Sequence, residues 1–333
     1  MSPHRERAHG GAVRAAARHY GIPENEWLDL STGINPHGWP VPELDPELWR
    51  RLPEPDDGLD QAGRAWAGAP ASAGCLPVPG TQAAIQLLPN LGEPATVGVP
   101  EPGYNEHARW WQRAGHRLVP VRPDSPEPPL EQLDVLVWIH PNNPTGDQHP
   151  RAVLRDWHQR LARRGGWLVV DEAFLDDPQE SMAPFAGETG LVVLQSLGKL
   201  FGLAGARTGL VFAPRALCTD LEERLGPWGL PGPTRAIMLR ALADHAWQHE
   251  NREHLRGQSR RLQTLLEKHD FTVTGRTALF AWCPAAKARE IAGALAQQAI
   301  LVREFSKPPG LRFGLPGDEH AWQKLDQALS RLP

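Results

Sequence analysis

Cysteine is scarce in this chain of 333 residues, and a long uncharged apolar segment is missing from it. The three cysteines, Cys75, Cys218 and Cys283, lie far apart and include no CxxC pair, so we expect neither a disulfide framework nor a bound metal. No uncharged apolar run approaches the ~20 residues that span a bilayer. The polar start MSPHRERAHGG lacks the apolar core of a signal peptide. These absences predict a soluble cytoplasmic protein that makes no membrane contact.

Positive charge is limited as well. The formal net charge is -4 at pH 7, and the sequence contains no basic run. A protein that binds nucleic acid usually has a basic face or tail. We therefore expect no nucleic-acid partner.

Lysine is rare among the basic residues, with 5 lysines against 30 arginines. Four of them lie in polar helical stretches or, for Lys307, before two prolines, whereas Lys199 lies in the mostly apolar, glycine-bearing stretch LQSLGKLFGLAGARTG. Arginine cannot replace an amine that must lose its proton, because guanidinium stays charged. Lys199 is therefore a candidate to form an imine with an aldehyde. The alternative is an ordinary buried stem with an exposed ammonium group.

Short apolar runs alternate with amphipathic ones through the middle of the chain. This alternation predicts an α/β fold with a mostly parallel sheet that is covered on both faces. Ligands of such sheets bind at the carboxyl ends of the strands. The expected strands are 96–99, 118–121, 135–139, 167–170, 192–195 and 209–212, and the expected helices are 81–88, 105–114, 151–164 and 214–225.

The pattern changes after residue 227 and predicts a smaller α+β domain at the C-terminus. We expect an N-terminal arm that is part of the small domain (1–45), a large domain (46–227) and a small C-terminal domain (228–333). In the last of these, a long polar helix pattern covers 233–268 and further helices cover 285–298 and 319–329. The strand-like runs there are 271–274, 278–282, 300–303 and 311–313.

Asp171 ends the apolar run WLVVD, so its carboxylate should emerge at the carboxyl edge of the predicted sheet. A single aspartate after a strand is more often a capping or turn residue. The functional interpretation is a carboxylate that keeps a pyridinium nitrogen protonated, as pyridoxal phosphate chemistry requires.

The stretch HPNNPTG, residues 140–146, follows the apolar run VLVWI and predicts a loop. Pro144 and Gly146 are sufficient reason for an ordinary turn. The functional interpretation gives the Asn143 amide a hydrogen bond to an aromatic oxygen of a cofactor.

Three further features would complete a site for a phosphorylated ring. Ser196 precedes Lys199 and Arg207 follows it, and a guanidinium suits bidentate phosphate binding. Residues 80–82, Gly-Thr-Gln, precede a predicted helix whose first amides can bind phosphate. Tyr104 is one of only two tyrosines and can stack on a pyridine ring. Each feature taken alone also fits a turn, a surface arginine or a partly buried aromatic residue.

Taken in chain order, these features resemble the fold-type-I, aspartate-aminotransferase-like superfamily of pyridoxal-phosphate enzymes, within the class I/II aminotransferases. The resemblance covers roughly residues 25–330. The residues that carry it are Gly80, Thr81, Gln82, Tyr104, Asn143, Asp171, Ser196, Lys199 and Arg207.

The resemblance implies pyridoxal 5'-phosphate as the cofactor, with Lys199 and Asp171 as the catalytic residues. Lys199 would hold the cofactor as a Schiff base and Asp171 would bind the pyridine nitrogen. Asn143 would contact the ring oxygen and Tyr104 would stack on the ring. The phosphate would be bound by Ser196, Arg207 and residues 80–82. Members of the superfamily are normally homodimers.

The N-terminal region resembles one branch of this superfamily, the threonine-phosphate decarboxylases of the cobalamin pathway. The resemblance rests on His9-Gly10-Gly11 before a helix and on DLSTGINPHG, residues 29–38. That branch removes CO2 from O-phospho-L-threonine and yields (R)-1-amino-2-propanol O-phosphate. The implied substrate-binding residues are His9, Gly10, Asn35, Asn143, Arg303 and Arg312. From the sequence alone, His9 also fits a tail residue and Arg303 a solvent-facing charge.

Phe174 departs from the usual aminotransferase pattern, which has tyrosine three residues after the aspartate. The missing hydroxyl removes a hydrogen bond to the ring oxygen; it favours the decarboxylase branch or is a neutral change. The alternative function is a histidinol-phosphate-aminotransferase-like transamination of a phosphorylated amino compound. A third hypothesis is a non-catalytic regulator that binds pyridoxal phosphate, but such proteins typically carry a DNA-binding module, for which this chain leaves no room.

Overall fold

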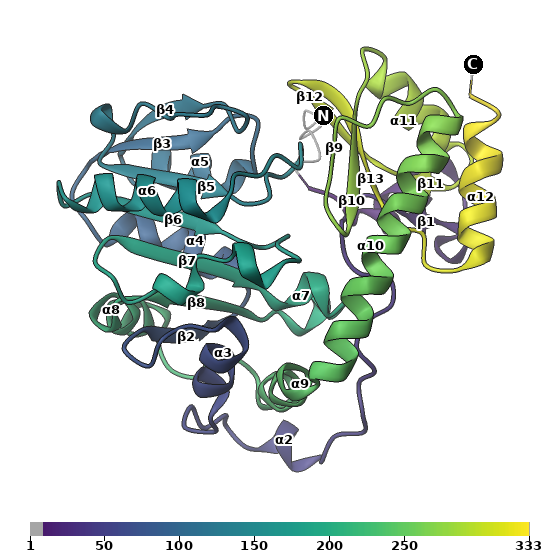
Figure 1. Ribbon diagram of the computed structural model, residues 1–333. Coiled ribbons are helices and arrows are strands. Elements are labelled where there is room, and N and C mark those ends of the chain that lie inside the picture. The colour runs from purple at the N-terminus through teal and green to yellow at the C-terminus, as the bar shows by residue number, and fades with distance from the viewer. Residues whose placement is uncertain (1–8, 333) are drawn as a thin grey trace, which may run out of the picture. The chain divides into compact units, whose positions relative to one another are not determined.

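The computed structural model describes residues 9–332, which form two compact units (Figure 1). The large unit is continuous, Gly38–Asn251, and the small unit combines the described residues up to His37 with those from Arg252 onward. The boundary predicted after residue 227 falls before helix α9 (Gly232–Ala243), which packs against α3 (Leu59–Ala67) inside the large unit. The division by packing therefore comes later in the chain than the predicted one.

The large unit contains a seven-stranded sheet with the order β2-β8-β7-β6-β5-β3-β4. Within this sheet β8 is antiparallel to both of its neighbours and the other pairs are parallel. The prediction of a mostly parallel sheet is confirmed. The strands are β2 (Gly74–Val78), β3 (Thr96–Pro100), β4 (Arg117–Val121), β5 (Val135–Ile139), β6 (Trp167–Asp171), β7 (Leu191–Ser196) and β8 (Gly209–Ala213).

Helices cover both faces of this sheet. The helices of the large unit besides α3 and α9 are α2 (Glu47–Arg50), α4 (Thr81–Leu87), α5 (Asn105–Arg113), α6 (Arg151–Ala162), α7 (Leu197–Leu200) and α8 (Arg215–Leu225). Val137 of β5 belongs to a buried cluster with Ile85 of α4. Its neighbour Trp138 packs against Trp157 of α6, with 4.9 Å between ring centroids. Successive residues of one apolar strand thus face opposite helical layers, as a doubly covered sheet requires.

Strand β2 is absent from the sequence prediction, because Gly74 and Pro77 make it a poor strand candidate. Its place in the sheet explains why the proline is tolerated. β2 lies at one edge of the sheet, and β4 at the other edge contains Pro120. Proline lacks a backbone N–H, so edge strands accept it more readily than central ones.

The small unit contains a four-stranded antiparallel sheet with the order β12-β13-β10-β9 and a separate parallel pair, β1 and β11. The strands are β1 (Leu28–Asp29), β9 (Gly275–Arg276), β10 (Phe280–Pro284), β11 (Ile300–Leu301), β12 (Arg303–Ser306) and β13 (Pro309–Gly314). The helices are α1 (Val13–Tyr20), α11 (Ala288–Ala296) and α12 (Glu319–Leu329), and α10 (His245–Lys268) contains the division between the units. Short 3-10 helices in the described part of both units lie at Glu24–Glu26, Leu88–Asn90, Leu130–Gln132, Pro178–Glu180, Ala183–Phe185 and Ala204–Ala206.

Three predicted elements of the C-terminal region are wrong. The strand expected over 300–303 is two strands, β11 and β12, which belong to different sheets. The single helix expected over 233–268 is divided into α9 and α10 at Asp244, which leaves helical geometry at φ -85° and ψ 73°. Its carboxylate accepts a hydrogen bond from the backbone N–H of Trp247 at 3.1 Å, and an aspartate in this position favours the start of a new helix. The strand expected over 271–274 is displaced to β9, Gly275–Arg276.

No helix in the described part of the chain is both long and apolar enough to cross a membrane.

Candidate active site

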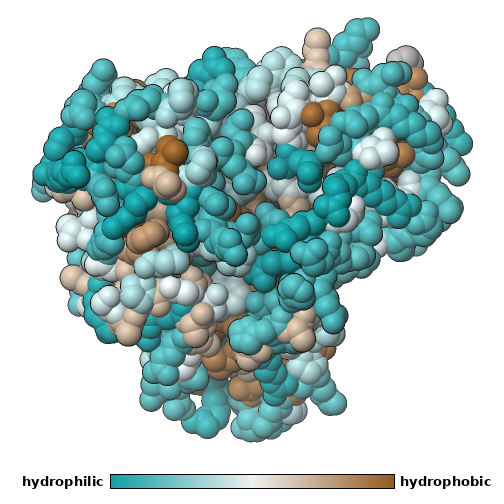
Figure 2. All heavy atoms as spheres, viewed as in Figure 1, coloured by the Kyte–Doolittle hydropathy of each residue, from teal (hydrophilic) through white to brown (hydrophobic). Residues whose placement is uncertain are grey.

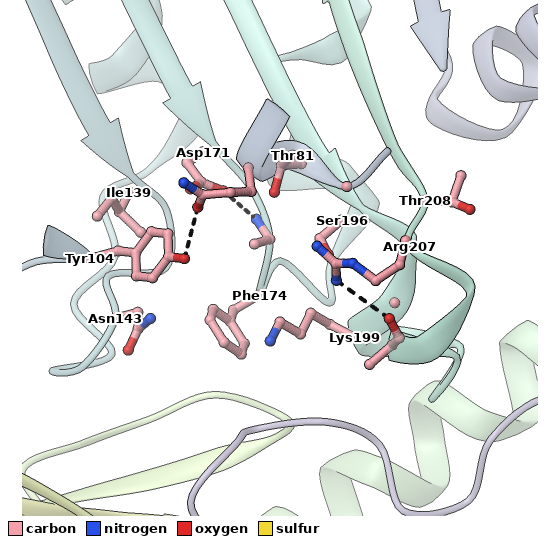
Figure 3. Close-up of a pocket in the computed structure, with 15 residues that line it drawn as sticks. Thr81, Tyr104, Ile139, Asn143, Asp171, Phe174, Ser196, Lys199, Arg207 and Thr208 are labelled. Carbon is pink, nitrogen blue, oxygen red and sulfur yellow. Dashed lines mark hydrogen bonds between the residues drawn. The ribbon is translucent and has the colours of Figure 1, made fainter. Parts of the chain in front are cut away.

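A pocket of about 150 Å³ in the large unit opens at the carboxyl ends of the central strands. All nine residues predicted to bind the cofactor line it (Figure 3). They come from the N-terminus of α4 and the glycine before it, the residue before α5, the loop after β5, the end of β6 and the β7–β8 segment. The nine are Gly80, Thr81, Gln82, Tyr104, Asn143, Asp171, Ser196, Lys199 and Arg207.

Asp171, the last residue of β6, is 3% exposed and hydrogen-bonded at both carboxylate oxygens. Oδ1 accepts the backbone N–H of Ala173 at 3.1 Å. Oδ2 lies 2.9 Å from Nε2 of His107, which is itself buried. Because a carboxylate only accepts, Nε2 of His107 is the donor. The two contacts fix a carboxylate at the strand end, where it can bind a protonated pyridine nitrogen.

His107 is a site residue that the sequence analysis misses. It lies in α5, three residues after Tyr104, and the two rings are 6.2 Å apart. Residues three apart lie on the same side of a helix, so the spacing is a signal once Tyr104 is a candidate. Its partner Asp171 is 64 residues away in the chain, and no local pattern predicts that contact.

Tyr104 is held by a chain of hydrogen bonds to Gln82 and Glu106. Its hydroxyl donates to Oε1 of Gln82 at 3.0 Å, and Nε2 of Gln82 donates to the buried carboxylate of Glu106 at 3.0 Å. Burial raises the pKa of Tyr104 to about 12, and the charges of Glu106 and Asp171 add to the rise. The phenol therefore stays neutral. Because the Gln82 side chain makes these contacts, a role of Gln82 in phosphate binding would have to come from its backbone N–H.

Three polar side chains, Thr81, Ser196 and Arg207, gather on one side of the pocket (Figure 3). Gly80 lies beside them at φ +75°, a conformation that favours glycine. A Cβ on Gly80 would lie 2.7 Å from Nη2 of Arg207, so a side chain here would displace that guanidinium. Two hydroxyls, a guanidinium and an open turn form a group of donors that fits a phosphate.

Lys199 lies in α7, directly after β7, and its side chain enters the pocket (Figure 3). Its Nζ lies 5.2 Å from the ring centroid of Phe174, which is buried. Phe174 therefore presents an aromatic face to the amine where tyrosine would add a hydroxyl. Asn143 lines the opposite side of the pocket, in a turn where the Asn142 backbone N–H donates to the carbonyl of Asp147 at 2.8 Å.

Glu172 is a second buried acid that the sequence analysis misses. Its carboxylate accepts hydrogen bonds from Ser181 Oγ at 2.7 Å, Met182 N at 2.7 Å and Gln195 Nε2 at 2.8 Å. Burial raises the pKa of Glu172 to about 7, the three hydrogen bonds oppose the rise, and the charge of Asp171 adds to it. Glu172 thus links the end of β6 to β7, directly beside the carboxylate that faces the pocket.

The other predicted substrate residues, His9, Gly10, Asn35, Arg303 and Arg312, belong to the small unit. Asn143 alone of the predicted substrate residues lines the pocket of the large unit. Within the small unit, Arg303 of β12 and Arg312 of β13 are opposite each other in the antiparallel ladder. Burial, together with the charge of Arg303, lowers the pKa of Arg312 to about 9. A buried guanidinium with a second, half-buried one beside it fits an anionic ligand.

Asn35 and His9 differ in environment. Asn35 is 2% exposed, and its Oδ1 accepts the backbone N–H of His37 at 2.8 Å. His9 is exposed. Gly10 lies against Ser31, whose carbonyl oxygen a Cβ on Gly10 would strike.

The donor set of the large-unit pocket fits pyridoxal 5'-phosphate. An amine, a fixed carboxylate and a phosphate-binding group line one cavity, and each has the chemistry that one part of this cofactor requires. Gly80 leaves the phosphate side of that cavity open. The large unit therefore brings together side chains whose chemistry matches each part of this cofactor.

Comparison with known proteins gives a consistent result. Residues 69–332 match the model of the family described as aminotransferase class I and II. A threonine-phosphate decarboxylase from Pseudomonas aeruginosa is 47% identical over 96% of both chains. Another, from a Sinorhizobium species, is 38% identical over 97% of this chain and 98% of its own.

Among solved structures, histidinol-phosphate aminotransferase from Sinorhizobium meliloti in complex with pyridoxal-5'-phosphate is similar to this chain. Its TM-score is 0.81 at 19% identity, with 96% of this chain and 93% of that chain covered. At this identity the similarity shows the fold, and it confirms the predicted fold-type-I architecture.

Proposed function

The chain belongs to the aminotransferase class I and II family, and on that premise we propose that it decarboxylates O-phospho-L-threonine. The product is (R)-1-amino-2-propanol O-phosphate, for cobalamin biosynthesis. The observation that carries the proposal is similarity along nearly the whole chain to two threonine-phosphate decarboxylases. The pocket supports it, because all nine cofactor-binding residues line a single cavity.

Pyridoxal phosphate, when bound, supplies an aldehyde that joins to an amine and a ring that withdraws electrons from bonds at the substrate Cα. Lys199 would supply the amine and Asp171 would hold a proton at the pyridine nitrogen. Thr81, Ser196 and Arg207, which line the same pocket, would bind the phosphate of the cofactor. Tyr104 would stack on the ring and Asn143 would bind its oxygen. Lys199 would also return a proton to Cα once the carboxylate has left as CO2.

Side chains that bind the substrate decide which bond at Cα breaks. In a decarboxylase the carboxylate must stand perpendicular to the plane of the cofactor ring, whereas in an aminotransferase the hydrogen does. We assign the substrate carboxylate to Arg312, and the phosphate to Arg303 and residues 9–10. Binding both anionic ends of the substrate would set the orientation of the bonds at Cα relative to the ring. Such positioning favours the geometry from which the chosen bond breaks.

The test supplies O-phospho-L-threonine without a keto-acid acceptor. Release of CO2 with formation of the amino alcohol phosphate supports the decarboxylase. Turnover only in the presence of 2-oxoglutarate would support the alternative, a histidinol-phosphate-aminotransferase-like reaction. The Lys199→Ala variant should lose CO2 release and should not trap the cofactor with borohydride; a variant with wild-type turnover would contradict the assignment.

We also propose that the protein is a homodimer. Four apolar side chains of the large unit are exposed: Trp49 at 72%, Leu52 at 63%, Trp228 at 59% and Val41 at 51%. Figure 2 shows apolar residues gathered over α2 and α9, the region that contains Trp49 and Leu52. Exposed aromatic side chains in such a group favour an interface. Light scattering should give twice the chain mass, and Trp49→Ser should weaken the dimer; a monomeric wild type would contradict the proposal.

A further inference from the structure

Ser31 of the small unit is 2% exposed, and each of its polar groups has a hydrogen-bond partner. Its backbone N–H and its hydroxyl both donate to Oδ1 of Asp29, at 2.9 and 2.6 Å. Oγ also accepts the backbone N–H of Gly11 at 2.8 Å. The Ser31 carbonyl accepts Nη2 of Arg312 at 2.8 Å. One side chain and its backbone therefore join three segments that are distant in sequence.

The direction of each hydrogen bond is fixed by chemistry. A serine hydroxyl has one hydrogen, and in Ser31 the acceptor-only carboxylate of Asp29 takes it. The lone pairs of Oγ then face the N–H of Gly11, which can only donate. This arrangement fixes the rotamer of Ser31 and the position of the backbone at Gly11, whose φ is +79°.

Gly10 adds a steric constraint at the same residue. A Cβ on Gly10 would strike the Ser31 carbonyl oxygen, which is the atom that accepts from Arg312. The segment of residues 9–11 and the Arg312 guanidinium thus both lie against the peptide group of Ser31. A displacement of Ser31 would move both.

The charged groups around Arg312 also connect it to Ser31, through the carboxylate of Asp29. Three neighbours face its guanidinium: Arg303 across the ladder, Asp29 of β1, and the ring of Phe280 of β10, whose centroid is 5.1 Å from Cζ. Asp29 favours the charged form of Arg312, whereas Arg303 opposes it. Ser31 holds the Asp29 carboxylate with two donors, and so fixes the position of that counter-charge.

We propose that Ser31 is a positioning residue for the substrate, which holds Arg312 and residues 9–11 at a fixed separation so that both anionic ends of the substrate are bound in one geometry. The inference rests on the proposed function. Ser31 itself acts through these groups and need not touch the substrate. Asp29 assists by keeping Arg312 charged.

The first experiment compares Ser31→Ala with the wild type as holoenzyme. The change removes the anchor of Gly11 and one of the two donors to Asp29, and we expect KM for O-phospho-L-threonine to rise roughly tenfold, the effect of losing about one hydrogen bond to a charged group. A fall in kcat is expected too, because the tilt of Cα is less well fixed. The absorbance spectrum of the bound cofactor and its Kd should not change, since the cofactor residues lie in the large unit.

Two control variants separate positioning from a general loss of structure. Ser31→Thr keeps the hydroxyl and should restore KM to within a few-fold of wild type. Ser330→Ala removes an exposed serine of the small unit whose hydroxyl donates to the Gln327 carbonyl, and should change nothing. The Kd of the product, (R)-1-amino-2-propanol O-phosphate, measured by spectral titration without turnover, should rise in Ser31→Ala.

The second experiment uses the pH profile. Asp29→Asn keeps an oxygen that can accept from Ser31 but removes the charge that favours protonated Arg312. The alkaline limb of the kcat/KM profile should therefore move to lower pH, which a purely structural role would not produce. A wild-type KM in Ser31→Ala, or a loss of cofactor binding equal to the loss of substrate binding, would overturn the inference alone. A wild type that releases no CO2 would overturn the proposed function and this inference with it.

Discussion

At the scale of single residues, the buried carboxylate of Glu106 sets the orientation of side chains that line the cofactor pocket. Glu106 accepts from Gln82 and from Trp110 Nε1, both at 3.0 Å. Because a carboxylate only accepts, the amide nitrogen of Gln82 must face Glu106 and its oxygen must face Tyr104. The hydrogen of the Tyr104 hydroxyl is thereby committed to Gln82. This hydrogen bond and the raised pKa of Tyr104 support the proposed stacking role of its ring.

Glu106→Gln should disturb this chain of hydrogen bonds, although glutamine has nearly the same shape as glutamate. A glutamine at this position can present either an oxygen or an N–H group, so the orientation of the Gln82 amide is no longer fixed. We expect the Kd of pyridoxal phosphate to rise about three- to tenfold, corresponding to a net hydrogen bond of about 1 kcal/mol. Glu101→Gln, in an exposed position between β3 and α5, is the matched control and should leave the Kd unchanged. An unchanged Kd in both variants would contradict the role of Glu106.

Glu172 predicts a pH dependence of stability. Its pKa rises from 4.5 in the unfolded chain to about 7 in the folded protein, chiefly through burial. Between these values the folded state binds more protons, so the free energy of unfolding falls as the pH rises, by at most about 1.4 kcal/mol per pH unit for one group. Glu172→Gln cannot lose a proton and should show a smaller fall in urea titrations between pH 5 and 7. Parallel pH dependences in the two proteins would contradict this account.

At the scale of elements, the turn from β2 into α4 combines a positive φ with a close approach to Arg207. Gly80→Ala should be strained at φ +75° and should also press on Nη2 of Arg207. Gly21→Ala is a matched control, because Gly21 has φ +68° and no atom within 4 Å of an added Cβ. Both variants should lose about 1 kcal/mol or more of stability. Only Gly80→Ala should also weaken cofactor binding, by roughly tenfold or more; equal Kd values in the two variants would contradict the steric role.

The strand ends of the large unit are what sequence reasoning predicts well. Asp171 and Ser196 each end an apolar run, and parallel strands bring such ends to one edge. Their neighbours His107, Glu106 and Glu172 escape prediction, because each takes its role from a partner in another element. Asp244 shows a second limit, since it leaves helical geometry and caps the start of α10 without any break in the polar pattern.

At the scale of the whole molecule, the three cysteines share one property. All are buried. Burial raises the pKa of Cys218 and of Cys283 to about 12 and raises that of Cys75 further. A buried neutral thiol is a poor nucleophile. The native protein should therefore release almost no chromophore from a disulfide reagent at pH 7.5, and the unfolded protein should release three equivalents. Rapid reaction of a native thiol would contradict the burial described for that residue.

Contacts between distant parts of the chain lie beyond sequence reasoning at this scale. The hydrogen bond from Arg312 to Ser31 joins residues 281 positions apart. The motif around residues 9–11 does not reveal that Ser31 is its neighbour. The need for glycine at position 10 nevertheless follows from that contact, because a Cβ would strike the Ser31 carbonyl oxygen. The family resemblance supplied the predicted roles of these residues, and packing supplies the physical connection between them.

The small unit is assembled from both ends of the polypeptide, whereas the large unit is one continuous segment. Strand β1 pairs with β11, so the N-terminal segment acquires its partner only when nearly the whole chain has been synthesised. Domains generally fold as units while the ribosome is still adding residues. The nascent chain is thus expected to complete its cofactor pocket first and to bring Arg303 and Arg312 together last.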